Sequence, residues 1–126
     1  RDACSKLRQQ IPELEAWIDQ EAAGPHPFII LGDFNRRLNI EKDTFWSEID
    51  DGDPTNADLT NITKNKSISC RNNKYDTFID HIIFDKRSWK WVDDSSFRHA
   101  TYRKLDEPVW DKISDHCPVI VELWIK

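Results

Sequence analysis

The sequence lacks the features that mark several common protein classes. Its 126 residues include no methionine and only three glycines, and no apolar run approaches membrane-spanning length. The motifs of serine hydrolases, zinc proteases, dinucleotide-binding folds and P-loops are also absent. Cys4, Cys70 and Cys117 form no CxxC pair, which argues against structural zinc and leaves open one disulfide with a free thiol or three reduced thiols. What remains is one small domain without a membrane span.

An excess of positive charge is lacking as well. The chain has 18 Lys and Arg against 23 Asp and Glu, which gives a formal net charge of −5 at pH 7. Such a surface favours solubility and has no overall attraction for nucleic acid. A polyanionic substrate would therefore need a local basic patch or a bound metal cation. No feature of the sequence indicates a cellular compartment.

Hydrophobic periodicity predicts a helix at the start of the chain, followed by a strand. The buried stripe of this helix consists of Leu7, Ile11, Leu14 and Ile18. Pro12 marks either a kink or the opening of a second helical segment, and Gly24 with Pro25 ends the element. The run 28–31 is apolar at every position, a pattern typical of a strand that is covered on both faces.

The rest of the chain is predicted to hold one short helix, one long loop and three strands. The expected elements are a helix over 44–49, a loop or irregular insertion over 55–74, and strands over 78–85, 89–92 and 119–125. In strand 78–85, Asp80 shares a face with Phe78 and Ile82, whereas His81 faces the other side, where a core or surface role is favoured over metal binding. Residues 119 and 125 are expected on the inner face of the last strand. This order of elements predicts an α/β or α+β fold.

Three polar sites accompany the predicted strands. Asp33 and Asn35 follow strand 28–31, Asp80 lies within an apolar strand, and Asp115 with His116 precedes the last strand. A carboxylate in the setting of Asp80 is costly unless it is paired. His116 is the candidate partner, because an aspartate can fix the tautomer of a histidine and raise its basicity. Asp115 then points away from His116 and is available to a metal, and the whole set suits attack of water on phosphorus.

The segments GDFN (32–35), IDHI (79–82) and SDHCP (114–118), in this order, resemble the endonuclease/exonuclease/phosphatase superfamily. Taken alone, the first and third segments are compatible with ordinary turns, whereas Asp80 in the second is harder to explain as a simple strand residue. The combination of the three is specific. The likeness covers nearly all of the chain and only the C-terminal half of the family domain. It implies that 1–126 form a single partial domain, half of a deoxyribonuclease I-like sandwich with a mixed β-sheet flanked by helices.

The resemblance also implies catalytic roles in a metal-dependent phosphoesterase. Asp33 would orient or deprotonate the attacking water, or protonate the leaving oxygen. Asn35 would hydrogen-bond the phosphate or the departing oxygen. His116, with Asp80 behind it, would contact the scissile phosphate or act as the general base. A phosphodiesterase or nuclease is favoured, and a small-molecule or lipid phosphatase is the alternative.

Metal and substrate ligands follow from the same resemblance. Asp115 and Asp33 would bind Mg²⁺ or Mn²⁺. Arg36 and Arg37 follow the GDFN turn directly and would meet the phosphate together with Asn35 and His116. The expected partner is a phosphate-ester substrate, with nucleic acid among the candidates.

One departure from the family pattern keeps a second hypothesis open. Family members carry an Asn and a metal-binding Glu on earlier strands, and neither has a counterpart in this sequence. The chain is therefore expected either to belong with a missing N-terminal half or to cover its exposed sheet face by self-association. Under the second hypothesis it is a catalytically incomplete half-domain that acts as a binding or assembly module.

Overall fold

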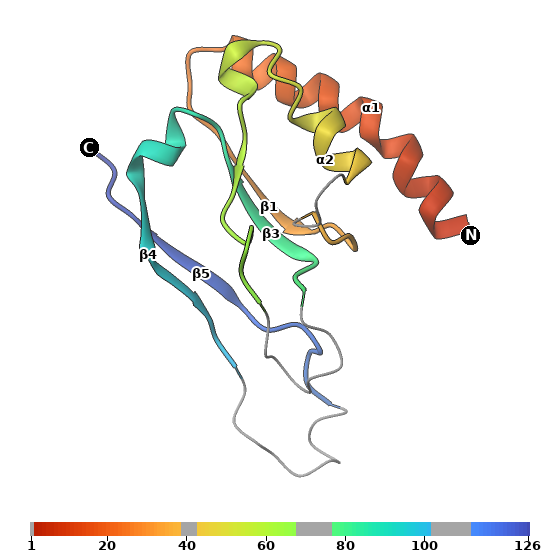
Figure 1. The fold of residues 1–126 in the computed structure, drawn as a ribbon, viewed down its shortest axis with the longest axis vertical. Coiled ribbons are helices and arrows are strands. Elements are labelled where there is room, and N and C mark those ends of the chain that lie inside the picture. Colours follow the sequence, from red (N-terminus) through yellow and green to blue (C-terminus); the bar gives the residue numbers. More distant parts are fainter. Residues whose placement is uncertain (1, 39–42, 68–76, 102–111) are drawn as a thin grey trace.

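The computed structural model describes residues 2–38, 43–67, 77–101 and 112–126. The helices and strands are α1 (Asp2–Ala23), β1 (Ile29–Asp33), α2 (Thr44–Ile49), η1 (Thr55–Ala57), β2 (Thr60–Asn61), β3 (Asp80–Phe84), η2 (Ser88–Trp91), β4 (Val92–His99) and β5 (Val119–Leu123). The α-helices lie on one side of β1 and β3, and β4 with β5 forms a separate ribbon (Figure 1). None of the described helices is long and apolar enough to cross a membrane.

The described strands form two antiparallel sheets. The larger has the order β1-β3-β2 and the smaller pairs β4 with β5. In the β1–β3 register, Ile29 lies opposite Phe84 and Asp33 lies opposite Asp80. Residues directly opposite each other in an antiparallel pair share a face of the sheet, so the two aspartates project from the same face at one end of the pair. The predicted α+β class is confirmed.

A hydrophobic core fills the space between the helices and one face of β1 and β3. Its buried members are Ile18, Ala22, Leu38, Phe45, Ile49, Ala57, Leu59 and Ile83. The predicted helical stripe is confirmed, because Ile18 is 2% exposed and the other three residues pack against this core. Helix α1 continues through Pro12 as one element. Burial of a side chain such as Ile18 contributes about 1.5–3 kcal/mol.

The short helix α2 was predicted with the correct bounds. Its N-terminus is capped by Asp43, whose carboxylate accepts a hydrogen bond of 3.0 Å from the backbone N–H of Trp46. Such a cap is worth about 1 kcal/mol. Phe45 and Ile49 lie on its buried side, as the spacing predicted. This helix therefore closes the core next to the turn that follows β1.

Several sequence predictions were wrong in detail. Strand β1 is covered on one face only, because Leu31 is 71% exposed while Ile30 packs against the core. The expected loop over 55–74 contains η1 and β2, and Ile62 within it is buried because its backbone joins β3. The remainder of that loop, from residue 68, lies outside the described residues. Polar residues in 55–67 hid the packing of that segment from a reading of hydrophobicity alone.

The C-terminal third also differs from the prediction. Residues 88–91 form a 3₁₀ turn instead of a strand, and the strand begins at Val92 and runs to His99. Strand β5 ends at Leu123, and Ile125 is 68% exposed instead of facing inward. Cys4 is a free, exposed thiol, whereas Cys117 is disulfide-bonded, which confirms one disulfide with one free thiol.

Candidate active site

The turn after β1 fixes the orientation of the Asp33 carboxylate. Asn35 has a positive φ of 49°, a conformation that asparagine tolerates better than most residues. Its backbone N–H donates a 2.7 Å hydrogen bond to Oδ1 of Asp33, and its side-chain amide donates one of 3.3 Å to Oδ2. These bonds hold the carboxylate at the edge of the sheet without occupying all of its lone pairs.

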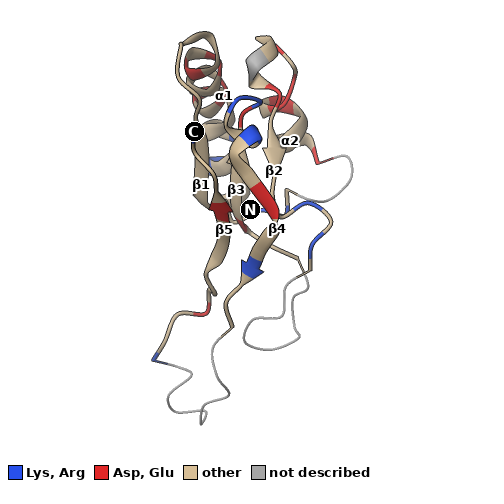
Figure 2. Cartoon of the chain, turned by 90° about the vertical axis from the view of Figure 1, so that its left-hand side faces the viewer, with Lys and Arg blue, Asp and Glu red and all other residues tan. Residues whose placement is uncertain are grey.

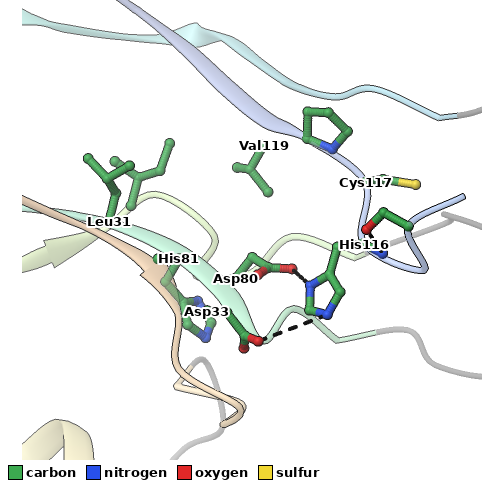
Figure 3. Close-up of a pocket in the computed structure, with 11 residues that line it drawn as sticks. Leu31, Asp33, Asp80, His81, His116, Cys117 and Val119 are labelled. Carbon is green, nitrogen blue, oxygen red and sulfur yellow. Dashed lines mark hydrogen bonds and ion pairs between the residues drawn. The ribbon is translucent and has the colours of Figure 1, made fainter.

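His116 connects the two aspartates of the sheet. Its Nδ1 lies 2.7 Å from Oδ2 of Asp80, and its Nε2 lies 3.9 Å from Oδ2 of Asp33 (Figure 3). Since a carboxylate can only accept, Nδ1 carries the hydrogen of the shorter bond. Asp80 thereby fixes the tautomer and the ring orientation, and Nε2 is turned toward Asp33.

The carboxylates around His116 also determine its charge. The hydrogen bond from Asp80 raises the pKa of the imidazole above its ordinary value, and the negative charges of Asp80, Asp33 and Asp115 add to this effect, while burial opposes it. The His116 side chain is 38% exposed, so solvent reaches the ring. The carboxylates thus shift the imidazole toward its protonated form relative to an ordinary histidine.

A pocket of about 400 Å³ opens in front of these three side chains. Asp33, Asp80 and His116 line its polar end, and Leu31, Ile82 and Val119 line an apolar wall (Figure 3). Cys117 follows His116 in the chain and also lines the pocket, so the disulfide restrains the segment that carries His116. The arrangement combines acidic, basic and apolar groups around one concavity, as in many ligand sites.

The order of the three motifs and this geometry agree with a comparison of the chain with known protein families. The family model described as endonuclease/exonuclease/phosphatase family matches residues 5–116. This chain belongs to the endonuclease/exonuclease/phosphatase family. Comparisons with curated proteins and with solved structures gave no significant match. Family membership makes the chain a phosphoesterase or nuclease-type protein at the superfamily level, and its place as the C-terminal half of the family domain stays a prediction.

The structure brings together the residues that the family resemblance singled out as an acid–histidine set. Asp33, Asp80 and His116 each offer a ligand atom within 4.8 Å of the others. Asp115 was expected to point away from His116, but its Oδ1 lies 3.9 Å from Nε2, the same distance as Oδ2 of Asp33. Two carboxylates therefore approach the same nitrogen, and Asn35 adjoins the set through its bonds to Asp33. The catalytic roles of these residues stay predictions.

The two arginines that follow the GDFN turn are placed differently. Nε of Arg36 lies 2.9 Å from Oδ2 of Asp43, and its guanidinium lies 5.8 Å from the centre of the Phe45 ring. Arg36 thus links the turn to the start of α2. Arg37 is exposed. Neither arginine lines the pocket in front of His116, so their predicted contact with phosphate has no support in this geometry.

The sequence analysis missed the apolar wall of the pocket. Ile82 shares a face with Asp80, and Val119 was placed on an inner face, so period-two alternation contained the signal for these two residues. Leu31 was assigned to a doubly covered strand, and its exposure on the face that carries Asp33 and Asp80 could not be deduced from an entirely apolar run. A second groove, on the helix side of Asp33, had no sequence signal at all.

Proposed function

We propose that this chain carries the hydrolytic site of a metal-dependent phosphodiesterase, in which water attacks phosphorus. The observation that supports this proposal is the arrangement of His116 between two aspartates. Its Nδ1 lies 2.7 Å from Oδ2 of Asp80, and its Nε2 lies 3.9 Å from Oδ2 of Asp33. A histidine fixed by one carboxylate and facing a second, in an open pocket, suits general acid–base work and the binding of an anionic group.

In this proposal the scissile phosphate lies beside Nε2 of His116. The raised pKa of His116 favours the imidazolium form, which can donate a hydrogen bond from Nε2 to a phosphate oxygen. Asp33 accepts hydrogen bonds from Asn35 and retains lone pairs with which to orient and deprotonate water. Asp80 is a positioning residue, because it acts through the orientation and charge of His116.

The donor set fits a hard divalent cation. Asp33 and Asp115 supply carboxylate oxygens, and Mg²⁺ is commonly held by one or two carboxylates together with waters and substrate phosphate. Both carboxylates are solvent-accessible, with side-chain exposures of 38% and 79%, which leaves space for such waters. When bound, Mg²⁺ or Mn²⁺ would neutralise charge on the phosphate.

The charge distribution bears on the substrate. Figure 2 shows Lys and Arg at separate places along the chain, with Asp and Glu on α1 and near α2. The net charge of −5 adds no long-range attraction for a polyanion. The charge thus does not favour DNA over small phosphodiesters, and both are proposed as candidate substrates. If DNA is bound through local contacts with its phosphates, its cleavage should weaken strongly with added salt.

The experiment measures turnover of bis-p-nitrophenyl phosphate and nicking of a plasmid, with and without Mg²⁺ or Mn²⁺. His116→Ala should lower kcat/KM by about 10²–10⁴-fold, the usual contribution of a positioned acid–base group. His26→Ala is the matched control, because His26 is exposed and does not line the pocket. Equal turnover by the His116→Ala variant would refute the role proposed for this histidine.

A second candidate function, assembly without catalysis, is favoured by one observation. Leu31 is 71% exposed beside the proposed catalytic residues, and an exposed large apolar side chain in the middle of β1, the edge strand of the described sheet, is a candidate contact with a second copy of the chain. Light scattering should then give a dimer that Leu31→Lys converts to a monomer. A monomer in the unsubstituted chain, together with cation-dependent turnover, would reject this alternative.

A further inference from the structure

We propose that the groove between the first half of α1 and the 33–35 turn is a second subsite, which receives a flat aromatic substituent of the phosphodiester. The inference rests on the proposed function and specifies its substrate class. The groove has a volume of about 770 Å³, within the range of roughly 300–1,000 Å³ typical of small-ligand sites. Its walls include Leu7, Gln10, Leu14, Phe34, Asn35 and Phe45.

Asp33 joins this groove to the pocket in front of His116. Asp33 lines both concavities, which meet at the end of β1. A phosphodiester has two organic substituents, whereas a phosphomonoester has one. Phosphorus held next to Asp33 and His116 would therefore direct one substituent along the apolar wall of Leu31 and the other into the α1 groove. This geometry favours a diester.

The walls of the groove suit a planar ring. Phe34 and Phe45 meet edge to face, with their ring centres 6.1 Å apart and their planes at 88°. Leu7 and Leu14 of α1 supply the facing apolar surface, and both are half-buried. Phe45 is 2% exposed and supports Phe34 from behind, so the half-buried Phe34 is the aromatic ring that a flat ligand would contact.

Polar groups at the groove also match the edge of a heterocycle or a substituted aryl ring. Gln10 is exposed on α1 and presents a carboxamide with both donors and acceptors. Asn35 lies at the end that adjoins Asp33. A purely aliphatic chain would cover the Gln10 carboxamide without offering it a hydrogen bond, which is costly. A nucleobase and an aryl group share the favoured chemistry.

The test blocks the groove with a bulky residue. Gln10→Trp fills the groove, and Gln9→Trp introduces the same side chain on the neighbouring exposed residue, which does not line it. With bis-p-nitrophenyl phosphate, KM of the Gln10→Trp variant should rise about tenfold, the order expected from the loss of one stacking contact, while kcat changes less than about twofold. The Gln9→Trp variant should keep both constants. An unchanged KM in Gln10→Trp, or an equal rise in both variants, would overturn the subsite.

A binding measurement separates failure of the subsite from failure of the proposed function. If no cation supports turnover, the proposed function fails, and the groove is still tested by titrating the methyl-labelled chain with bis-p-nitrophenyl phosphate. The methyl NMR signals of Leu7 and Leu14 should shift and saturate, and those of Leu123, which lines neither concavity, should not. Absence of these shifts would overturn the inference. Shifts that depend on protein concentration instead of ester concentration would also overturn it, and they would assign the groove to contact with another copy of the chain.

Discussion

Two histidines lie at opposite faces of the β1–β3 pair, and they differ in burial and in their hydrogen-bond partners. On the helix side, His81 is 1% exposed, its Nε2 lies 2.7 Å from the carbonyl oxygen of Arg36 and its Nδ1 lies 2.7 Å from Oγ1 of Thr63. On the other side, His116 has one nitrogen bonded to Asp80 and the other facing an open pocket. Burial lowers the pKa of His81, whereas the Asp80 carboxylate raises that of His116.

This contrast shows how environment divides one residue type between structure and chemistry. A histidine whose two nitrogens both have buried partners is fixed in its neutral form and strengthens the core. A half-exposed histidine with one nitrogen held by a carboxylate retains the other for a ligand. Asp80 and His81 are consecutive in β3, so the alternation of a single strand assigns one to each face.

The largest expected effect is on the catalytic face. Asp80→Asn keeps an acceptor for Nδ1 of His116 and removes the negative charge. We expect kcat/KM to fall by about 10²–10³-fold, because the tautomer and charge of His116 are no longer fixed. The pKa of His116 should fall toward its ordinary value, as measured by NMR titration of the metal-free protein.

The pH profile of activity tests whether the loss of kcat/KM in Asp80→Asn results from the altered pKa of His116. In our proposal the imidazolium binds phosphate, so activity is lost as pH rises through the pKa of His116. The alkaline limb should therefore move to lower pH in Asp80→Asn. Asp58→Asn, at an exposed residue that lines neither concavity, is the control and should leave the profile in place. An alkaline limb that stays fixed in Asp80→Asn would contradict the role of Asp80.

Sequence reasoning could reach this face only in part. The pairing of Asp80 with His116 was predicted, because a carboxylate among apolar strand residues requires a partner. The opposition of Asp33 and Asp80 depends on the β1–β3 register, which joins residues that are distant in sequence. The proximity of Asp115 to Nε2 depends on an irregular turn, for which hydrophobic periodicity holds no signal.

The helix face was easier to predict than the β4–β5 ribbon for a physical reason. The stripe of α1 and the caps of α2 are local features with a clear helical period. Strand β4 contains the run 93–96, Asp-Asp-Ser-Ser, and among the strands that the structure describes it pairs with β5 alone, so no alternation of apolar residues revealed it. Likewise, nothing local predicted that His81 would bind the carbonyl of Arg36 across the core.

The second prediction concerns the covalent anchor of the catalytic face. Cys117→Ser removes the disulfide next to His116, and we expect the free energy of unfolding to fall by about 2–4 kcal/mol. The NMR signals of His116 should change more than those of His81, since the helix face is held by packing. Urea denaturation and histidine NMR measure the two effects. Cys4→Ser, at the free exposed thiol, is the control; an equal loss of stability in that variant would contradict the argument.

A third prediction acts on the helix face alone. His81→Leu leaves the carbonyl of Arg36 and the polar group of Thr63 without their buried partner, and we expect a loss of about 2 kcal/mol in the free energy of unfolding. Because burial lowers the pKa of His81 in the folded state, its stabilising contribution is complete above the ordinary histidine pKa and is lost as pH falls below it.

The difference in free energy of unfolding between the unsubstituted chain and His81→Leu should therefore shrink from pH 7 to pH 5, as measured by urea denaturation. His81 borders the same pocket as His116, but both of its ring nitrogens are bonded to Arg36 and Thr63, so activity per folded molecule should change little. If His81→Leu retains full stability but loses activity, His81 has a role in catalysis, and the division of the two histidines into a structural and a chemical one is wrong.

The smallest expected effect lies in a second acidic cluster, which carries no histidine. Glu15, Asp19 and Asp51 bring ligand atoms within 4.8 Å of one another, as do Asp33, Asp80 and His116. Burial, with the charges of Asp51 and Asp19, raises the pKa of Glu15 to about 7. The folded state thus favours protonated Glu15, and this stability is present at low pH and lost as pH rises from the ordinary glutamate pKa through about 7.

Glu15→Gln should raise the free energy of unfolding at pH 8 by up to about 1 kcal/mol, a bound reduced for solvent screening, and should change it little at pH 4. Glu13→Gln, at an exposed position of the same helix, should have no such pH dependence.

Thermal unfolding with added Mg²⁺ then compares the two clusters. A cation stabilises the fold only through the carboxylates that bind it. If stabilisation by Mg²⁺ persists in Glu15→Gln and disappears in Asp33→Asn, the cation binds near Asp33. The reverse result would place it at the cluster of Glu15.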